Sequence, residues 1–181
     1  MAGEKGASAL LGASVRFLCD AMLGGLAKWL RAAGYDTYYA SEGTDLSDRS
    51  LTRKALDEGR VILTSDGGFL ERKPVRDGSV GFLRVPHLPL EDQLRLVVGH
   101  FDLVRRQSRC MECNGELEAV PTGAVVGRVP RGVVREEREF FICEGCGRVF
   151  WHGSHWDRIS GRVSRVFGEI ALGSQRSART R

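Results

Sequence analysis

Four of the five cysteines occur as two Cys-x-x-Cys pairs, which are Cys110 with Cys113 and Cys143 with Cys146. Two thiolates separated by two residues can bind one tetrahedral ion from a single tight turn, and a second pair completes a closed four-sulfur zinc site. The interval 114–142 is longer than the usual spacing in such sites, so a long hairpin is expected between the pairs. Because a closed shell leaves no open coordination position, the predicted zinc is structural rather than catalytic. A redox pair and an iron–sulfur cluster are the alternatives, although a single redox pair would not explain both turns.

Three aspartates lie where a parallel sheet could bring them together. Asp20 and Asp66 each follow a short apolar run, and Asp48 begins a predicted helix. Each could instead be a turn residue or a helix cap, and Asp45 could serve as a cap or an outer ligand. Three carboxylates at the mouth of one sheet would repel one another unless a cation lay between them. Magnesium and manganese take such oxygen ligands, and either ion could lower the pKa of a bound water that attacks a phosphodiester.

The elements that must position these aspartates alternate between strand and helix. Apolar runs predict strands at 15–19, 35–40, 60–64 and 80–85, and helical spacing with capping signals predicts helices at 22–33, 48–58 and 89–98. This alternation indicates βαβ units and a mostly parallel sheet, and so an α/β fold. Ligands bind such sheets outside the carboxyl ends of the strands. If the first and third strands are neighbours, the carboxylates of Asp20 and Asp66 therefore converge at that edge.

The residue composition and the hydrophobic pattern of the sequence change at about Ser108. β-branched runs flank a Gly-, Pro- and Val-rich segment at 121–134, which suggests hairpins rather than helices, and a helix is predicted at 157–172. The chain therefore divides into a flexible N-terminal extension, an α/β domain, a small β-rich zinc ribbon with a C-terminal helix, and a disordered basic tail. The predicted limits of these parts are 1–14, 15–105, 106–172 and 173–181.

The composition of the 181-residue chain is basic, with a net charge of +4 carried by 23 arginines and 4 lysines against 23 acidic residues. Such a net positive charge permits a nucleic-acid partner without establishing one. A bias in the composition of the source genome would give the same excess of arginine. No apolar run reaches the roughly 18–20 residues of a membrane-spanning helix, and the N-terminal segment makes a poor secretory signal. We therefore expect a cytoplasmic protein with no membrane partner.

Three rival enzyme classes lack their motifs in this sequence. A nucleotide P-loop and a Gly-x-Ser-x-Gly elbow are missing, and the position two residues after Asp20 holds Met22 where a haloacid-dehalogenase-type phosphatase has a second acid.

Taken in order, these motifs resemble those of the Mut-seven C-terminal ribonuclease family. The resemblance runs from about Arg16 to Ile159 and includes residues 17–31, 34–37 and 59–66, the Cys-x-x-Cys-Asn at 110–114, and Phe150-Trp151-His152-Gly153-Ser154-His155-Trp156. It implies a three-layer PIN-like domain followed by a zinc ribbon. It also implies that Asp20, Asp48 and Asp66 form an acidic metal site and that the four paired cysteines bind zinc. PIN-type nucleases commonly carry a fourth acid, for which Asp45 and Glu71 are the candidates.

We therefore predict a metal-dependent ribonuclease in which Asp20 and Asp66 hold magnesium or manganese and Asp48 assists. RNA is the expected partner, and arginines such as Arg31, Arg72 and Arg148 are candidate phosphate contacts. The alternatives are a catalytically idle RNA- or ribosome-binding zinc-ribbon module and a toxin-like protein held by an antitoxin. PIN-like proteins often pair, but the sequence shows no interface for a homo-oligomer.

Two histidines and two tryptophans follow the second cysteine pair. His152 and His155 could be metal ligands, phosphate contacts or general acids, and packing against the ribbon is the simpler interpretation. Trp151 and Trp156 are expected to anchor the core or a domain interface rather than to stack on nucleobases.

Overall fold

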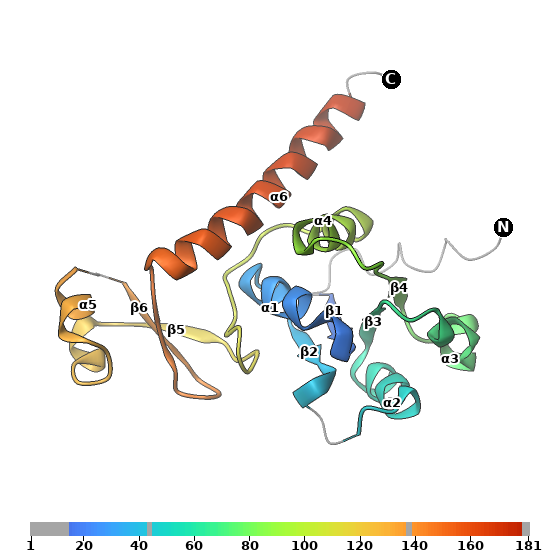
Figure 1. Cartoon of the computed structure of the whole chain (residues 1–181), viewed down its shortest axis with the longest axis horizontal. Helices are drawn as coiled ribbons and strands as arrows, with labels where there is room; N and C mark the ends of the chain where they lie inside the picture. Colours follow the sequence, from blue (N-terminus) through green and yellow to red (C-terminus); the bar gives the residue numbers. More distant parts are fainter. Residues whose placement is uncertain (1–14, 43–44, 137–138, 179–181) are drawn as a thin grey trace.

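A parallel sheet with helices on both faces is followed along the chain by a small antiparallel sheet and a long terminal helix (Figure 1). The structure, a computed structural model, describes residues 15–42, 45–136 and 139–178, with the side chains of residues 42 and 171–178 outside this description. The predicted extension at 1–14 lies outside the described residues. The mixed α/β fold with a mostly parallel sheet and a second, smaller sheet is confirmed.

Four parallel strands form the larger sheet in the order β2-β1-β3-β4. They are β1 (Arg16–Cys19), β2 (Thr37–Tyr39), β3 (Arg60–Thr64) and β4 (Phe82–Arg84). Phe17 in β1 lies opposite Thr37 on one side and Val61 on the other. After an initial arginine, each of the two central strands is a run of buried apolar and β-branched residues, as is typical of strands whose faces are both covered. β1 and β3 are therefore neighbours, as the convergence of Asp20 and Asp66 requires.

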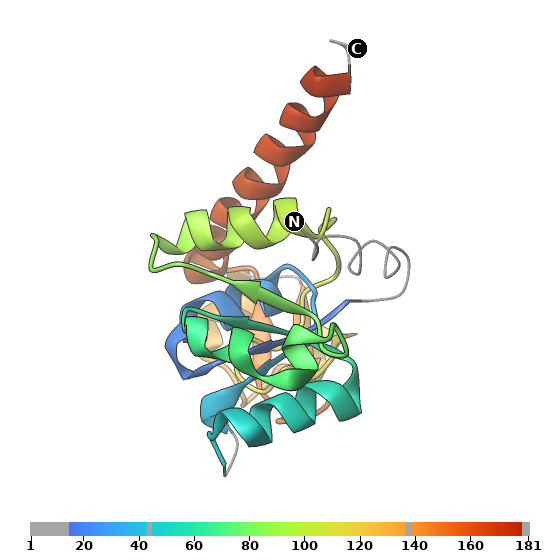
Figure 2. The same cartoon turned by 90° about the vertical axis from the view of Figure 1, so that its right-hand side faces the viewer.

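Helices connect these strands and cover the two faces of the sheet. The connections contain η2 (Ala21–Leu23), α1 (Gly24–Ala32), η3 (Ala40–Glu42), α2 (Asp48–Glu58), η4 (Gly67–Glu71), α3 (Lys73–Arg76) and α4 (Leu90–His100), where η marks a 3-10 turn. In Figure 2 the yellow-green α4 lies on one side of the sheet and the teal α2 on the other. α2 and β3 begin and end at the predicted residues, and the other predicted elements differ by a few residues at their ends.

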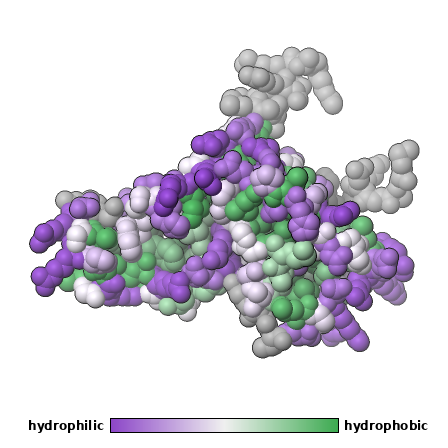
Figure 3. Space-filling model, viewed as in Figure 1, coloured by the Kyte–Doolittle hydropathy of each residue, from purple (hydrophilic) through white to green (hydrophobic). Residues whose placement is uncertain are grey.

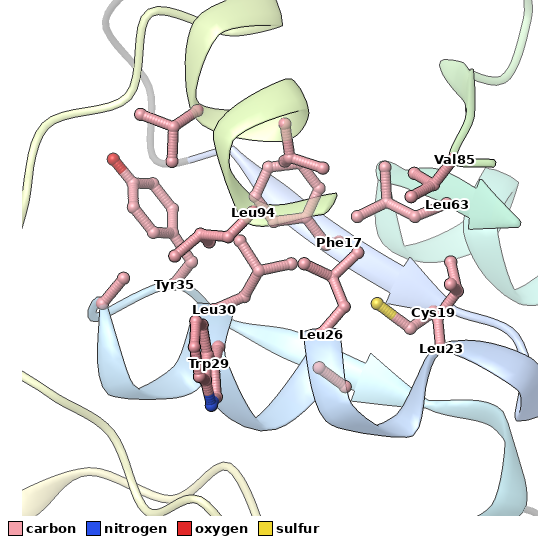
Figure 4. Close-up of a cluster of buried hydrophobic side chains, with 14 of the residues drawn as sticks. Phe17, Cys19, Leu23, Leu26, Trp29, Leu30, Tyr35, Leu63, Val85 and Leu94 are labelled. Atoms are coloured by element: carbon pink, nitrogen blue, oxygen red, sulfur yellow. The ribbon is translucent and has the colours of Figure 1, made fainter. Parts of the chain in front are cut away.

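Alternation of side chains along β1 and β3 divides the core between the two faces. On one face, Phe17, Cys19 and Leu63 pack with the buried residues of α1 and α4, as the close-up in Figure 4 shows. On the other face, Leu18 and Ile62 pack with buried residues of α2 and η4. Every residue named here is fully buried or nearly so, which fixes the register of the two strands that carry the acidic edge.

The second sheet is antiparallel and consists of β5 (Leu117–Val120), β6 (Phe140–Cys143) and β7 (Val149–Trp151). Between β5 and β6 the chain forms η5 (Thr122–Val125) and the helix α5 (Arg131–Glu136). The expectation of hairpins without helices at 121–134 is therefore wrong for this stretch. Pro130 precedes α5 and accepts a hydrogen bond from Val134 at its backbone oxygen, and its fixed φ suits the first turn of a helix.

The terminal helix α6 (Ser154–Ala178) packs against α4 and α1 through the buried Val163 and Val166. It starts before the predicted Asp157 and continues past Leu172, so residues 173–178, expected to be disordered, are helical. One internal glycine such as Gly173 costs a helix only about 1 kcal/mol, which is too little to end it. Residues 179–181 of the predicted tail lie outside the described part. None of the helices in the described part of the chain is long and apolar enough to cross a membrane.

Candidate functional site

The carboxyl edge of the parallel sheet links Asp20 and Asp66 through Thr64. Asp20 directly follows β1, and Asp66 lies two residues beyond the end of β3. The Thr64 hydroxyl donates a hydrogen bond to the Asp20 carboxylate and accepts one, at 2.9 Å, from the backbone N–H of Asp66. The backbone N–H of Asp20 donates to the carbonyl of Leu63 at 3.1 Å. A continuous chain of hydrogen bonds therefore fixes both acids at one edge of the sheet.

The two aspartates also cap the 3-10 turns that follow them, which was the simpler interpretation of each. Asp20 Oδ1 accepts from the backbone N–H of Met22 at 2.9 Å, and Asp66 Oδ1 accepts from that of Gly68 at 2.8 Å. Asp20 is only 6% exposed, whereas Asp66 is exposed. Each ionised carboxylate offers about four lone-pair sites, so capping leaves acceptor capacity for a cation. The two roles are therefore compatible.

Asp48 lies in the first turn of α2, where Ser47 is the N-cap. Its Oδ2 is 2.9 Å from Nη2 of Arg72, which lies just before α3. Arg72, expected to contact a phosphate, is therefore engaged by an acid of the predicted metal site. Asp45 accepts from the backbone N–H of Ser47 at 2.9 Å, so it stabilises the turn before α2 and is not the helix cap. This hydrogen bond lowers the pKa of Asp45. Glu71, the other candidate fourth acid, is exposed at the end of η4.

Sequence reasoning missed the two hydroxyl residues directly before Asp66, which are the last residue of β3 and the residue after it. Thr64 is fully buried and joins the two acids, and Ser65 is 8% exposed. Within the described residues, the Ser65 hydroxyl is a buried polar atom without a hydrogen-bond partner. Such an atom is costly to leave unpaired, and it lies next to Asp66. The run Thr64-Ser65-Asp66 at a strand end was the available signal, because hydroxyls beside an acid at that edge can orient it.

The four paired cysteines form one cluster. Cys110 Sγ lies 3.7 Å from Cys146 Sγ, and Cys113 Sγ lies 3.3 Å from Cys143 Sγ. All four sulfurs lie within 4.8 Å of one another, and all four cysteines are free thiols. In a tetrahedron with zinc–sulfur bonds of about 2.3 Å the sulfurs stand about 3.8 Å apart, which is close to the observed spacing. The cluster could therefore hold a metal ion.

Two tight turns build this cluster. The backbone N–H of Asn114 donates to the carbonyl of Cys110 at 2.9 Å, and that of Gly147 donates to the carbonyl of Cys143 at 2.8 Å. Residue 115 must be glycine, since an added Cβ would lie 2.7 Å from Cys143 Sγ. Burial raises the pKa of the Cys143 thiol, but hydrogen bonds from the Cys146 backbone and the Cys113 side chain outweigh it and lower the pKa to about 7. Burial raises the pKa of the neighbouring Cys110 thiol to about 12. Because metal binding requires thiolates, an ion in the cluster would displace protons from these cysteines.

The chain matches a known protein family over a range that includes both the sheet edge with Asp20 and Asp66 and the cysteine cluster. The model of the Mut7-C RNAse domain matches residues 15–163. The chain belongs to the Mut7-C RNAse domain family. The resemblance inferred from the motifs is therefore confirmed. Among characterised proteins, the chain is 27% identical to the human exonuclease mut-7 homolog over 222 residues, an alignment that covers 80% of this chain and 25% of that protein. It spans only about a quarter of the length of that relative.

In this Mut7-C chain, Arg31 attaches the cysteine cluster to the parallel-sheet domain. Arg31 is 1% exposed, so the expectation that it contacts phosphate is wrong. Its Nη1 donates to the carbonyls of Met111 and Glu112 at 3.0 and 2.9 Å, and its Nε donates to that of Thr37 at 2.9 Å. Both Met111 and Glu112 lie between the first two cysteines. The guanidinium group of Arg31 therefore donates hydrogen bonds both to the turn between Cys110 and Cys113 and to β2.

Asn114, which follows the first cysteine pair, forms the second attachment. Its Nδ2 donates to Asp36 Oδ1 at 2.7 Å, and its Oδ1 accepts from the backbone N–H of Thr37 at 2.9 Å. Asp36 also pairs with Arg60 at 2.7 Å. Asp36 precedes β2 and Arg60 begins β3, so the ribbon is attached at the amino edge of the parallel sheet. The cysteine cluster and the acidic edge therefore lie at opposite ends of the strands.

The histidines and tryptophans after the second cysteine pair lie at the surface or half-buried. His152 is exposed, with its ring 5.8 Å from that of Phe141 and 6.2 Å from that of Trp156. Its Nε2 is 3.8 Å from a carboxylate oxygen of Glu139. Trp156 packs against the core cluster, in agreement with an anchoring role. Arg148, the third candidate phosphate contact, is exposed and lies 3.6 Å from Glu112.

Proposed function

We propose that this chain is a divalent-metal-dependent nuclease that hydrolyses RNA at the carboxyl edge of the parallel sheet. In this proposal Asp20 and Asp66 bind magnesium or manganese, and Asp48 assists directly or through water. The observation that carries it is the hydrogen-bonded chain from Asp20 through Thr64 to Asp66. Membership of a family described as an RNAse domain, a relative described as an exonuclease and the basic net charge support it.

Among the described residues, only the four cysteines form a group of three or more side chains close enough to hold a metal ion, so the structure does not gather Asp20, Asp48 and Asp66 into one such group. The proposal therefore rests on the pair Asp20 and Asp66, which suits a hard cation whose remaining ligands are water and phosphate. Carboxylates from two neighbouring strands lie at one edge, and the buried Ser65 hydroxyl leaves polar capacity there unused. A bound magnesium or manganese ion would lower the pKa of a water molecule and offset negative charge on the phosphodiester. Thr64 has the positioning role, since its hydroxyl orients the Asp20 carboxylate. Arg72 holds the carboxylate of Asp48, so binding of an ion by Asp48 requires that this pair opens or shares the carboxylate.

The nuclease proposal is tested with purified protein, end-labelled single-stranded RNA and added manganese or magnesium. Asp20→Asn and Asp66→Asn should each lower the cleavage rate about 100-fold or more, because each removes charge that binds the ion. Asp77→Asn is the matched control, since Asp77 also accepts from a backbone N–H two residues later, Ser79, but lies after α3. Cleavage that is unchanged in both site variants would refute the proposed mechanism.

We further propose that the four cysteines hold one structural zinc ion. The near-tetrahedral spacing of four cysteine sulfurs supports zinc rather than a hard cation, which prefers oxygen ligands. Metal analysis of protein purified without added metal should give about one zinc per chain. Cys113→Ser should lose the zinc, whereas Cys19→Ala, which changes the buried cysteine of β1, should retain it. A metal-free chain with a fully folded ribbon would contradict this assignment.

A second candidate function is an RNA-binding module without catalysis. One observation favours it, namely that the carboxylate of Asp48 is engaged by Arg72. RNA binding that persists in chelator, with no cleavage under any divalent metal, would select this function. Arg72→Gln separates the cases further, since freeing Asp48 should raise the affinity for the catalytic ion if Asp48 is a ligand.

A further inference from the structure

A cavity of about 220 Å³ lies where the segment that leads into the ribbon meets the small sheet and the start of α6. Its aromatic lining consists of Phe141, Phe150, Trp151, His152 and Trp156. None of these five side chains is buried, although four of them are large hydrophobic rings. On the face shown in Figure 3, the ribbon at the left also presents hydrophobic surface between hydrophilic residues. Most of the aromatic motif after the second cysteine pair therefore surrounds an open site.

Two arginines give this site positive charge. Arg105 donates to Ser160 Oγ at 2.6 Å and to the hydroxyl of Ser164, which are both neutral partners. The guanidinium of Arg106 lies 4.9 Å from the ring centroid of Tyr35. Both arginines are exposed, and within the described residues neither forms an ion pair with a carboxylate. A third lining arginine, Arg109, is paired with Glu116 at 3.3 Å.

This site is separate from the acidic edge. The ribbon is attached at the amino edge of the parallel sheet, and Asp20 and Asp66 lie at the carboxyl edge. α1, which connects the two edges, has nine residues and is therefore about 14 Å long. A ligand in the cavity does not reach the acids, but a single strand of nucleic acid can extend from one edge to the other.

We propose that the cavity receives one unpaired nucleobase of single-stranded RNA, with Arg105 and Arg106 contacting the phosphates beside it. This inference deepens the proposed function and rests on it for the choice of RNA. The aromatic walls offer stacking surfaces for a planar ring, which gives Trp151 and Trp156 a role beyond the anchoring expected from the sequence. The uncompensated guanidinium groups complement a polyanion. The cavity is smaller than the roughly 300–1,000 Å³ of pockets for drug-sized ligands, so it fits a base rather than a whole nucleotide. The ribbon thereby anchors the strand several nucleotides away from the cleavage edge.

Tryptophan fluorescence reports on this cavity directly. Two of the three tryptophans, Trp151 and Trp156, line it, whereas Trp29 is 7% exposed in the core. Trp29→Phe therefore leaves a protein whose emission arises at the cavity. The probe is a single-stranded adenosine 12-mer, titrated into the Asp20→Asn, Asp66→Asn protein so that no cleavage interferes. The 12-mer should quench the emission, and the same strand in a duplex should quench it far less, because its bases are already stacked.

The charge variant Arg105→Gln, Arg106→Gln should weaken binding of the 12-mer about tenfold or more. The control Arg131→Gln, Arg135→Gln removes the same charge from exposed positions of α5 in the same ribbon, away from the cavity, and should change affinity much less. Trp156→Leu tests stacking and should cost a similar factor. Because Trp156 also packs against the core, the exposed His152→Ala provides a second variant that preserves the fold.

The outcomes separate this inference from the nuclease proposal. Quenching and affinity that are unchanged in both the charge variant and His152→Ala would overturn the nucleobase site, even if the wild-type protein cleaves RNA. Equal loss in the charge variant and its α5 control would also overturn it, since the effect would then be one of net charge. Quenching that is lost in the cavity variants supports the site, whether or not the wild-type protein shows cleavage.

Discussion

Removing the side chain of Asn114 should loosen the ribbon from the parallel-sheet domain. Asn114 has a backbone φ of +69°, which glycine adopts without cost, so Asn114→Gly removes the side chain while preserving the turn. Two hydrogen bonds are lost, one to the carboxylate of Asp36 and one from the backbone N–H of Thr37. Both partners lie outside the ribbon, at the amino edge of the parallel sheet.

The structure sets the size of this effect. Thr37 is fully buried, and a buried N–H left without a partner costs about 1–3 kcal/mol. A hydrogen bond to a charged group contributes about 1.5–3 kcal/mol, but Asp36 keeps Arg60 and its side chain is 26% exposed, so the lower end applies. We therefore expect Asn114→Gly to lower the free energy of unfolding by about 2.5–4.5 kcal/mol. Asn114→Ala should cost about 1 kcal/mol more, because alanine is strained at this φ.

The measurement is urea-induced unfolding of the zinc-loaded protein, followed by far-ultraviolet circular dichroism, with hydrogen exchange to locate the change. Exchange should increase at the amides of β2 and of the first cysteine turn before it increases in β3. Gly147, which also has a positive φ but lies in the second turn, provides the control variant Gly147→Asn. An Asn114→Gly protein within about 0.5 kcal/mol of wild type would refute the assigned role of this side chain.

Three further outcomes follow from the same contacts. Arg31→Met should lower the free energy of unfolding by about 3 kcal/mol or more, because it leaves the buried carbonyl of Thr37 and two partly buried carbonyls of the first cysteine turn without their donor. Arg31→Lys should recover only part of this loss in the same urea titration. Thr64→Val should reduce metal-dependent RNA cleavage about tenfold or more while thermal unfolding shows a folded protein, since it removes the hydroxyl that orients Asp20; full activity would refute this role. Burial by itself would raise the pKa of Asp36, but hydrogen bonds from Arg60 and Asn114 hold that pKa below its usual value. The stability that this carboxylate contributes is therefore complete above its unfolded pKa of about 3.9 and is lost as pH falls through the lower folded pKa. In the Asp36→Asn protein the free energy of unfolding should therefore fall less than in wild type as pH drops from about 5 to 2. An equally steep fall in the variant would contradict the assignment.

Much of the fold and part of the candidate site follow from local sequence patterns. Apolar runs and helix caps predict α2 and β3 to the residue, because Ser47 and Gly59 delimit the helix chemically. The paired cysteines predict a four-sulfur cluster from spacing alone. The placement of Asp20 and Asp66 at one edge of the sheet follows from the general rule that parallel strands end at one edge, once β1 and β3 are neighbours. The sequence pattern was misleading at one place, because the Val-rich segment before β6, expected to form hairpins, contains the helix α5.

Other features were decided only by the tertiary structure, because they depend on contacts between distant parts of the chain. Arg31 is separated from Met111 by 80 residues, and no local pattern tells whether a guanidinium will bind phosphate or buried carbonyls. The pairing of Asp48 with Arg72 and the bridging hydroxyl of Thr64 depend likewise on how separate loops meet at the sheet edge. The aromatic cavity requires the ribbon, its leading segment and α6 to pack together. Sequence thus determined which charged, thiol and aromatic groups this protein carries, whereas packing determined which of them face solvent, because burial depends on the whole chain.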